Sequence, residues 1–241
     1  MDTLDHTATP ETLEEEFAQL LTPTRDLALA PACPLARAPA LPSPRALAVK
    51  HAADRVVAAL LILLVLPVLL VLVAAVKLSS QGPVLYRQRR IGRDGRAFDI
   101  LKFRSMRLPG AVDRFRPVTG AAPGGVEGAD RRTTVGRLMR RTSLDELPQL
   151  LNVVKGDMSL VGPRPERPEF VQLFADQVPG YADRHRVQVG MTGLAQVRGL
   201  RGQTSIARRA DADNEYIERW SLLLDLKVLA LTARAVVQPV E

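Results

Sequence analysis

Several residue types that mark particular functions are scarce in this chain. Its 241 residues include one cysteine, Cys33, so no intramolecular disulfide can form. Aromatic residues account for 4%, which argues against a stacking platform for single-stranded nucleic acid, and we expect no nucleic-acid partner. The three histidines are dispersed, and the sequence has no G-x-x-x-x-G-K-(S/T) motif, no G-x-G-x-x-G motif after a strand and no Cys/His metal spacing. Any metal is therefore expected to bind through oxygen ligands, which favours Mg²⁺.

The charge is unevenly distributed along the chain. Seven acids and three bases give residues 1–49 a charge of −4, which leaves +11 on residues 50–241 of a total of +7. A basic body suits anionic partners such as phosphates, nucleotides and lipid headgroups. Residues 1–46 lack the apolar stretch of a signal peptide, and five prolines fall within 30–46. We expect 1–46 to form a disordered, Pro/Ala-rich N-terminal extension.

A long hydrophobic run follows. From Val56 to Val76 there are 21 consecutive residues without a charge or a side-chain hydrogen-bonding group, about the length that a bilayer-spanning helix needs. We predict a membrane-inserted helix over 47–78, kinked at Pro67 because proline removes one backbone donor. Basic residues flank the run on both sides, so the positive-inside rule gives no orientation. A single-pass helix and a re-entrant helix with both ends in the cytoplasm remain equal alternatives.

The rest of the chain, 79–237, is expected to form a small α+β domain that is predominantly helical. The pattern in 83–103 predicts two short strands around a turn at Gly92–Gly95. The stretch near 108–130 is rich in Gly, Ala and Pro and predicts a mobile loop.

Three features are predicted in the C-terminal part. Gly190–Gly193 is interpreted as a turn. Residues 198–204 are basic and glycine-rich, so they form either a phosphate-binding loop or a loop with solvated arginines. Residues 213–237 are interpreted as one helix, which either packs on the core or lies at the membrane interface.

Two adjacent acids, Asp145 and Glu146, lie in the most informative stretch. Ser143 and Glu146 match a capping box, Pro148 also suits a first helical turn, and Gly156 is a good helix stop. Both acids are thus expected at a helix N-terminus. There they either only cap the helix or stay ionised, as a carboxylate nucleophile or metal ligand must.

The surroundings favour the functional interpretation of this acidic pair. Arg164 lies between two prolines that restrict its backbone, and a rigidly held guanidinium suits bidentate phosphate binding, although a surface turn is the alternative. Further arginines precede the pair: Arg131, Arg132, Arg137, Arg140 and Arg141. Phosphoryl transfer depends mainly on positioning and charge neutralisation, and such a setting provides both.

Several motifs occur in one order along the chain. They are Lys50-x-x-x-Asp54, the apolar run with Pro67, Gly82-Pro-Val-Leu-Tyr-x-Gln88, Lys102-Phe-Arg-Ser-Met106, Ser143-Leu-Asp-Glu-Leu-Pro-Gln149, Asn152-Val-Val-Lys-Gly-Asp-Met-Ser-Leu-Val-Gly-Pro-Arg-Pro165 and Gly193-Leu-Ala-Gln-Val197. From about residue 48 to 235 the chain closely resembles the bacterial sugar transferase family, the monotopic polyprenyl-phosphate glycosyl-1-phosphate transferases.

The resemblance implies a ping-pong reaction at the cytoplasmic face of a bacterial plasma membrane. Asp145 would attack the β-phosphate of a UDP-sugar, release UMP and hold a phosphosugar that polyprenyl (undecaprenyl) phosphate then accepts. Asp145 and Glu146 would also hold Mg²⁺. Further contacts with phosphate or nucleotide are implied for Lys102, Arg104, Arg164, Arg201 and Asp213.

The resemblance also favours a re-entrant helix bent at Pro67 and, from Arg201-Gly-Gln-Thr204 and Tyr216-x-x-x-Trp220, a hexose-1-phosphate such as that of glucose or galactose. The partners it implies are a UDP-sugar, polyprenyl phosphate and membrane lipid, and a homo-oligomer is left open. The alternative is a non-catalytic, membrane-tethered scaffold that binds anionic lipid or polysaccharide-assembly proteins. That alternative explains the apolar run and the charge but not the acidic pair among arginines.

Overall fold

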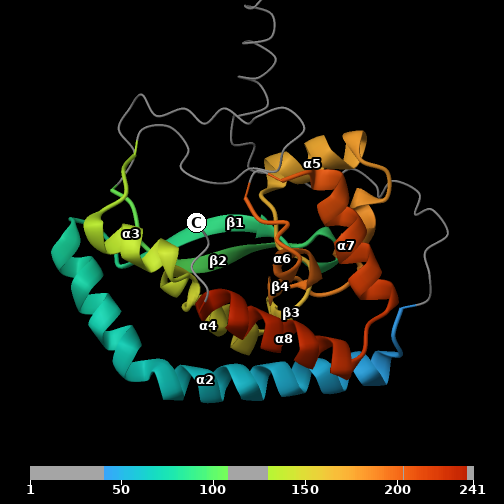
Figure 1. Ribbon diagram of the computed structural model, residues 1–241, viewed down its shortest axis with the longest axis horizontal. Coiled ribbons are helices and arrows are strands. Elements are labelled where there is room, and N and C mark those ends of the chain that lie inside the picture. Colours follow the sequence, from blue (N-terminus) through green and yellow to red (C-terminus); the bar gives the residue numbers. More distant parts are fainter. Residues whose placement is uncertain (1–40, 108–129, 203, 238–241) are drawn as a thin grey trace, which may run out of the picture. The chain divides into compact units, whose positions relative to one another are not determined.

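The computed structural model describes residues 41–107, 130–202 and 204–237, which belong to one unit of the chain (Figure 1). Most of the predicted extension 1–46 and nearly all of the predicted loop 108–130 lie outside these residues.

The apolar run forms one long helix, α2 (Pro44–Ser79). The hydroxyl of Ser43 accepts a hydrogen bond from the backbone N–H of Ala46 at 3.3 Å, and Pro44 occupies the first helical turn, where its missing N–H costs nothing. Pro67 lies inside the helix, and α2 bends partway along its length (Figure 1). A bend is the expected consequence of an internal proline.

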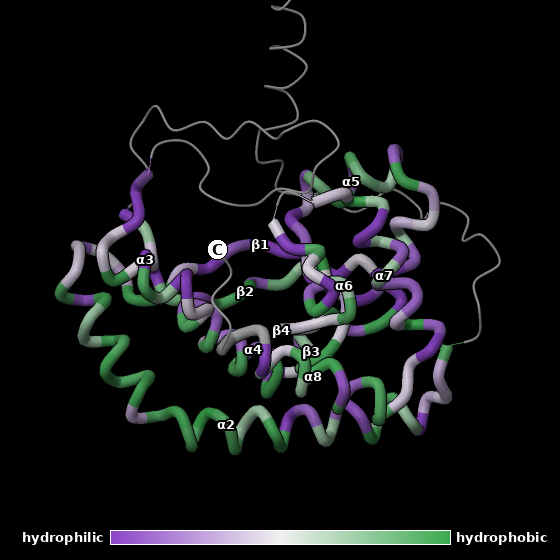
Figure 2. The backbone as a smooth tube through the Cα atoms, in the orientation of Figure 1, coloured by the Kyte–Doolittle hydropathy of each residue, from purple (hydrophilic) through white to green (hydrophobic). Residues whose placement is uncertain are grey.

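One side of α2 packs on the domain, and the rest of its surface is apolar and exposed. Ala58 is fully buried, and Leu72 and Val76 are buried in a second cluster with Phe103. Only 11% of the most apolar 18-residue window of the helix is buried. Figure 2 shows the hydrophobic colouring continuing along most of α2. The helix is therefore long and apolar enough to enter a membrane, and a soluble core helix would be mostly buried.

A β-hairpin follows, as predicted. Strand β1 (Leu85–Ile91) pairs antiparallel with β2 (Ala97–Phe103) in a register that joins Leu85 to Phe103 and Ile91 to Ala97. The turn η1 (Arg93–Gly95) contains positive φ values at Asp94 (56°) and Gly95 (73°). Asparagine, aspartate and glycine tolerate this left-handed conformation best, so Asp-Gly is a suitable pair here.

The remaining elements are mostly short helices. In chain order they are α3 (Thr134–Arg141), η2 (Leu144–Glu146), α4 (Gln149–Lys155), β3 (Ser159–Val161), α5 (Pro168–Gln177), η3 (Tyr181–Arg186), β4 (Gly190–Thr192), α6 (Leu194–Val197), α7 (Ile206–Glu218) and α8 (Leu222–Val237). The predicted α+β, mainly helical class is confirmed in the described residues.

The interpretation of Gly190–Gly193 as a turn is wrong. Residues Gly190–Thr192 form β4, which pairs in parallel with β3. A Cβ atom on Gly190 would lie 2.1 Å from the backbone nitrogen of Gly162, so these two backbone segments approach too closely for any side chain. Glycine is required here for close packing rather than for a turn.

The single helix predicted over 213–237 is also wrong, because it is interrupted between α7 and α8. The hydroxyl of Ser221 accepts a hydrogen bond from the backbone N–H of Leu224 at 3.1 Å and begins a new helix. The indole N–H of Trp220 donates to the carboxylate of Asp225 at 3.1 Å, which fixes the chain at the break. Serine capping therefore overrides the helical pattern on either side.

Candidate active site

Asp145 and Glu146 lie in the short 3₁₀ turn η2, ahead of α4 rather than in its first turn. The predicted capping box is wrong: Ser143 has a left-handed backbone (φ 57°), and its side chain makes no capping hydrogen bond. Helix α4 begins after Pro148, and it ends at Gly156 as predicted (φ 89°). The acids are thus held by a tight turn between α3 and α4.

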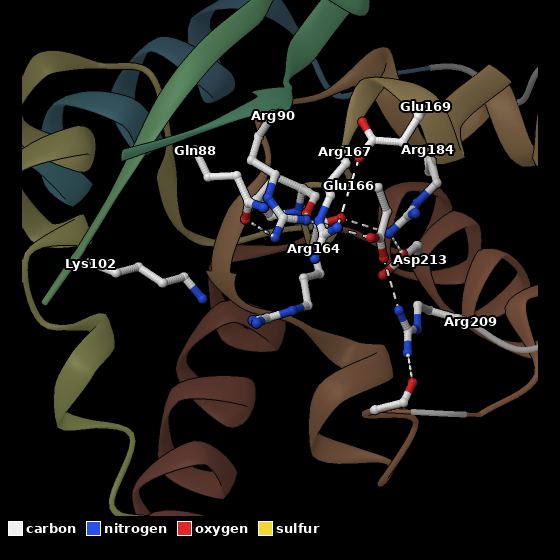
Figure 3. Close-up of polar contacts among 12 residues, drawn as sticks. Gln88, Arg90, Lys102, Arg164, Glu166, Arg167, Glu169, Arg184, Arg209 and Asp213 are labelled. Carbon is white, nitrogen blue, oxygen red and sulfur yellow. Dashed lines mark hydrogen bonds and ion pairs between the residues drawn. The ribbon is translucent and has the colours of Figure 1, made fainter. Parts of the chain in front are cut away.

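Glu146 forms ion pairs with two cationic side chains that come from distant parts of the chain. Its Oε1 accepts from Nζ of Lys102 on β2 at 2.7 Å and from Nη2 of Arg164, in the loop after β3, at 2.9 Å. Figure 3 shows the side chains of Lys102 and Arg164 extending toward one another. Three of the predicted site residues are thereby brought together.

Electrostatics keep Glu146 ionised. Burial by itself would raise the pKa of this carboxyl, but Arg164 and Lys102 outweigh burial and hold the pKa well below its ordinary value. The same contact with Glu146 raises the pKa of Arg164, whereas burial lowers the pKa of Lys102 despite its partner. Glu146 is therefore a fixed negative charge at the centre of a basic site.

Asp145 has the opposite environment. It is 8% exposed, and in the part of the chain that the structure describes it makes no direct ion pair. Burial, and then repulsion from Glu146, raise the pKa of Asp145, while Lys102 and Arg140 oppose that rise. This direction is contrary to the one expected from a helix N-terminus. The pair therefore joins Glu146, which has two cationic partners, with Asp145, which makes no direct ion pair among the described residues.

The other predicted contact residues lie in different surroundings. Arg201 is half-buried and close enough to Arg164 and Glu146 to be influenced by both charges. Arg104 is buried and donates to the carbonyls of Pro83, Ser80 and Val76. Its guanidinium thus binds the end of α2 and the segment that follows, and it makes no hydrogen bond to the acidic pair in the described residues. A phosphate contact for Arg104 stays a prediction.

Asp213 is 1% exposed and forms an ion pair with Arg184 at 2.5 Å. Burial raises the pKa of Asp213, and Arg184 opposes that rise. A contact of Asp213 with nucleotide also stays a prediction.

The donor set suits an oxygen-ligated cation. Within the described ranges no group of three or more His, Cys, Asp or Glu residues lies close enough to hold a metal by itself. In the described part of the chain Asp145 forms no direct ion pair, and both cationic partners of Glu146 bind Oε1, which leaves Oε2 for a further ligand. Mg²⁺ is commonly held by one or two carboxylates together with substrate phosphates. The acidic pair fits that pattern.

Asn152 is a site-supporting residue that the sequence interpretation did not single out. From α4 its Oδ1 accepts from the N–H of Leu101 at 3.0 Å, and its Nδ2 donates to the carbonyl of Asp99 at 2.8 Å. These bonds join α4 to β2 immediately before Lys102. The signal available in the sequence was a lone amide within the apolar run Leu150–Val154.

Comparison with known proteins identifies the family. The sequence model of the bacterial sugar transferase family matches residues 45–239. This chain belongs to that family. The resemblance inferred from the motifs is confirmed, and so is the expected enzyme class, a transferase, at the level of the family.

Members of the bacterial sugar transferase family with assigned names are similar over most of this chain. The UDP-glucose:undecaprenyl-phosphate glucose-1-phosphate transferases of Escherichia coli (strain K12) and Caulobacter vibrioides are 44% and 46% identical over 187 and 191 residues. Each alignment covers 76% of this chain, but 39% of the first relative and 67% of the second. The exopolysaccharide production protein PSS of Rhizobium leguminosarum bv. phaseoli is 40% identical, with 76% of this chain and 92% of that protein covered.

Proposed function

We propose that this sugar transferase moves a hexose-1-phosphate from a UDP-sugar to undecaprenyl phosphate through a covalent intermediate on Asp145. The observation that carries the proposal is the contrast within the acidic pair. Glu146 is compensated by Lys102 and Arg164, whereas the neighbouring Asp145 has no direct ion pair in the described part of the chain. A carboxylate nucleophile needs an unshared oxygen beside cations that can hold its phosphate target.

The proposed chemistry balances without an added proton donor. An oxygen of the Asp145 carboxylate forms a bond to the β-phosphorus, and the bond from that phosphorus to the bridging oxygen breaks, so UMP leaves. A phosphate oxygen of undecaprenyl phosphate then forms a bond to the same phosphorus and the acyl-phosphate bond breaks. Lys102 and Arg164 neutralise charge on the transferred group, which is the main requirement of phosphoryl transfer.

The proposal includes Mg²⁺ at the acidic pair. Asp145 and Oε2 of Glu146 would hold the ion together with substrate oxygens. When bound, Mg²⁺ supplies positive charge that offsets the diphosphate.

Glucose is the proposed sugar. The names of the Escherichia coli and Caulobacter vibrioides relatives specify UDP-glucose and undecaprenyl phosphate. Arg201-Gly-Gln-Thr204 and Tyr216-x-x-x-Trp220 resemble the hexose-1-phosphate branch of the family, which supports a hexose as well. The name of the Rhizobium relative supports a role in exopolysaccharide production.

The proposed topology is a re-entrant α2 with both ends at the cytoplasmic face. Near its first end, Lys50 forms ion pairs with Asp225 of α8 at 2.7 Å and with Asp54 at 3.2 Å. At its last turn, Arg104 donates to the carbonyls of Val76 and Ser80 at 3.4 and 2.6 Å. Because both ends of α2 are bound to the same polar domain, these contacts support a helix that enters and leaves the bilayer on one side.

UMP release tests the proposed reaction. Purified protein in nanodiscs with Mg²⁺, UDP-glucose and undecaprenyl phosphate should release UMP, and Asp145→Asn should lower the rate by at least roughly 10³-fold because the nucleophile is lost. The matched control is Asp176→Asn, an exposed acid on α5, which should keep the normal rate. Normal turnover by Asp145→Asn would refute the nucleophile assignment. No release by the unaltered protein across a panel of UDP-sugars would favour the scaffold alternative.

A further inference from the structure

The segment Pro163–Glu166, which carries Arg164, has every one of its four backbone carbonyls hydrogen-bonded. The donors, in order along the segment, are the N–H of Gly190 (2.8 Å), Nη2 of Arg184 (2.9 Å), Nη1 of Arg90 (3.2 Å) and the N–H of Ile91 (2.9 Å). Two of the four residues are prolines without an N–H, so the carbonyls are the main groups by which the backbone can be held. Two of the donors are arginine side chains rather than backbone.

Arg184 is the most enclosed of these donors. Its side chain is fully buried, and its Nη2 donates to the carbonyl of Arg164 and to the carboxylate of Asp213 at 2.5 Å. Its Nη1 donates to the hydroxyl of Tyr181 at 3.1 Å. Because a guanidinium is planar and rigid, these partners fix the direction in which it donates to Arg164. A fully buried side chain has no surface with which to contact a substrate.

Asp213 is buried equally deeply, on α7. Figure 3 shows its carboxylate beside Arg184 and the neighbouring ion pair of Glu166 with Arg209, whose atoms lie 2.8 Å apart. A buried ion pair generally adds little net stability compared with apolar residues of the same volume, because both charges lose their hydration. The ion pair does have a geometric effect: it fixes the guanidinium of Arg184, which donates to the backbone carbonyl of Arg164.

We propose that Arg184 and Asp213 are positioning residues that hold the backbone of Arg164 so that its guanidinium meets Glu146 and the phosphates of the donor. Here the donor is the UDP-sugar, so the inference rests on the proposed function. It gives Asp213 a different role from the nucleotide contact implied by the family resemblance. The route runs from Asp213 to Arg184, to the carbonyl of Arg164, and to Oε1 of Glu146.

A double-mutant cycle tests whether the pair acts through Arg164. Arg184→Met combined with Asp213→Leu replaces the ion pair by apolar side chains of similar volume, which commonly preserves folding. In the otherwise unaltered protein we expect kcat for UMP release to fall roughly tenfold or more, because small displacements of a positioning group are costly. In an Arg164→Ala background the same replacement should change kcat by less than about twofold.

The matched control is Glu215→Gln, which removes a partly exposed, arginine-paired acid from the same helix and should leave kcat unchanged. An equal fold-loss in both backgrounds, or no loss in the unaltered background, overturns the proposal. If the double replacement does not fold, Arg184→Lys serves instead, because lysine keeps the charge beside Asp213 but lacks the fork that reaches Arg164.

Amide hydrogen exchange separates failure of this inference from failure of the proposed function. The amides of Gly190 and Ile91, which donate to the carbonyls of Pro163 and Glu166, should exchange faster when the ion pair is replaced and at the normal rate in Glu215→Gln. That measurement needs no turnover, so an unaltered protein that releases no UMP would refute the function while exchange still decides the positioning role. Unchanged exchange in the variant would refute positioning.

Discussion

At the scale of single residues, Asp145 and Glu146 are neighbours with opposite titration behaviour. Burial raises the pKa of Asp145, whereas Arg164 and Lys102 overcome burial and lower the pKa of Glu146. Groups whose environments separate their pKa values commonly have different roles in one reaction. Here the separation agrees with the proposed nucleophile and the proposed supporting ligand.

The raised pKa of Asp145 gives a testable pH dependence. Only the ionised carboxylate attacks phosphorus, and a raised pKa keeps the protonated form to higher pH. As pH falls, single-turnover UMP release should therefore decline through a pKa above the ordinary aspartate value of 3.8. Measuring it without undecaprenyl phosphate avoids titration of the acceptor. A decline centred at or below 3.8 would contradict the expectation.

Arg140 offers a signed test of the same environment. Its charge lowers the pKa of Asp145, so Arg140→Gln should move the acid limb of UMP release to higher pH. Arg208→Gln removes the same charge from an exposed position on α7 and is the matched control. A limb that stays in place or moves to lower pH in Arg140→Gln would show that the field at Asp145 is different from the one described.

At the scale of elements, the site depends on how β2 meets α4. The amide of Asn152 satisfies the N–H of Leu101 and the carbonyl of Asp99, and Lys102 follows directly. Gly136 serves a similar close approach at α3, since a Cβ atom there would lie 1.8 Å from the carbonyl oxygen of Ser105. The hydrogen bonds of Asn152 and the close approach at Gly136 thus hold together the elements that bring Lys102 to Glu146.

Removal of the Asn152 amide should weaken the whole domain. Asn152→Ala leaves the buried backbone groups at Leu101 and Asp99 without these partners, so the free energy of unfolding should fall by about 1–3 kcal/mol. Val154→Ala, at an exposed position on the same helix, should change it by less than about 0.5 kcal/mol. Denaturant unfolding of both variants in detergent measures the difference. Equal stability of the two variants would mean that the amide does not join β2 to α4.

At the scale of the whole molecule, α2 joins a surface that is apolar enough to enter a membrane to the site. Its two ends are bound to the domain through Lys50–Asp225 and through Arg104, while most of its apolar surface faces away from the protein. Arg104, which binds the end of α2, follows Lys102 by two residues on the chain. The end of α2 is therefore joined to the strand that carries Lys102, the ion-pair partner of Glu146. Entry into a bilayer would therefore fix the site at the membrane surface, where a lipid-linked phosphate is found.

Thiol labelling tests this topology. In a Cys33→Ser background, Ala48→Cys and Gln81→Cys lie at exposed positions near the two ends of α2. We expect an impermeant reagent to reach both from the cytoplasmic face of membrane vesicles, as it reaches the control Gln177→Cys on α5. Labelling of the two ends from opposite faces would establish a spanning helix and refute the re-entrant proposal.

The sequence by itself determined the features that local chemistry dictates. The apolar run, the hairpin with its Asp-Gly turn and the Gly156 helix stop follow from composition, spacing and backbone preference, and ordered motifs identified the family. Local rules failed where distant chain segments meet. The turn at Gly190 was wrong because β4 forms only by pairing with the distant β3. Two further errors had local causes: Ser143 takes a left-handed backbone instead of a capping one, and the cap at Ser221 interrupts the C-terminal helix.

Only the tertiary structure decided which charges meet. Lys102 and Arg164 lie 44 and 18 residues from Glu146 along the chain, and no local pattern predicts that both donate to one carboxylate oxygen. Burial, which comes from packing alone, separates the titration of two adjacent acids and encloses Arg184 with Asp213. The physical reason is that sequence spacing sets which groups are available, whereas distance and desolvation, which set electrostatic strength, arise only on folding.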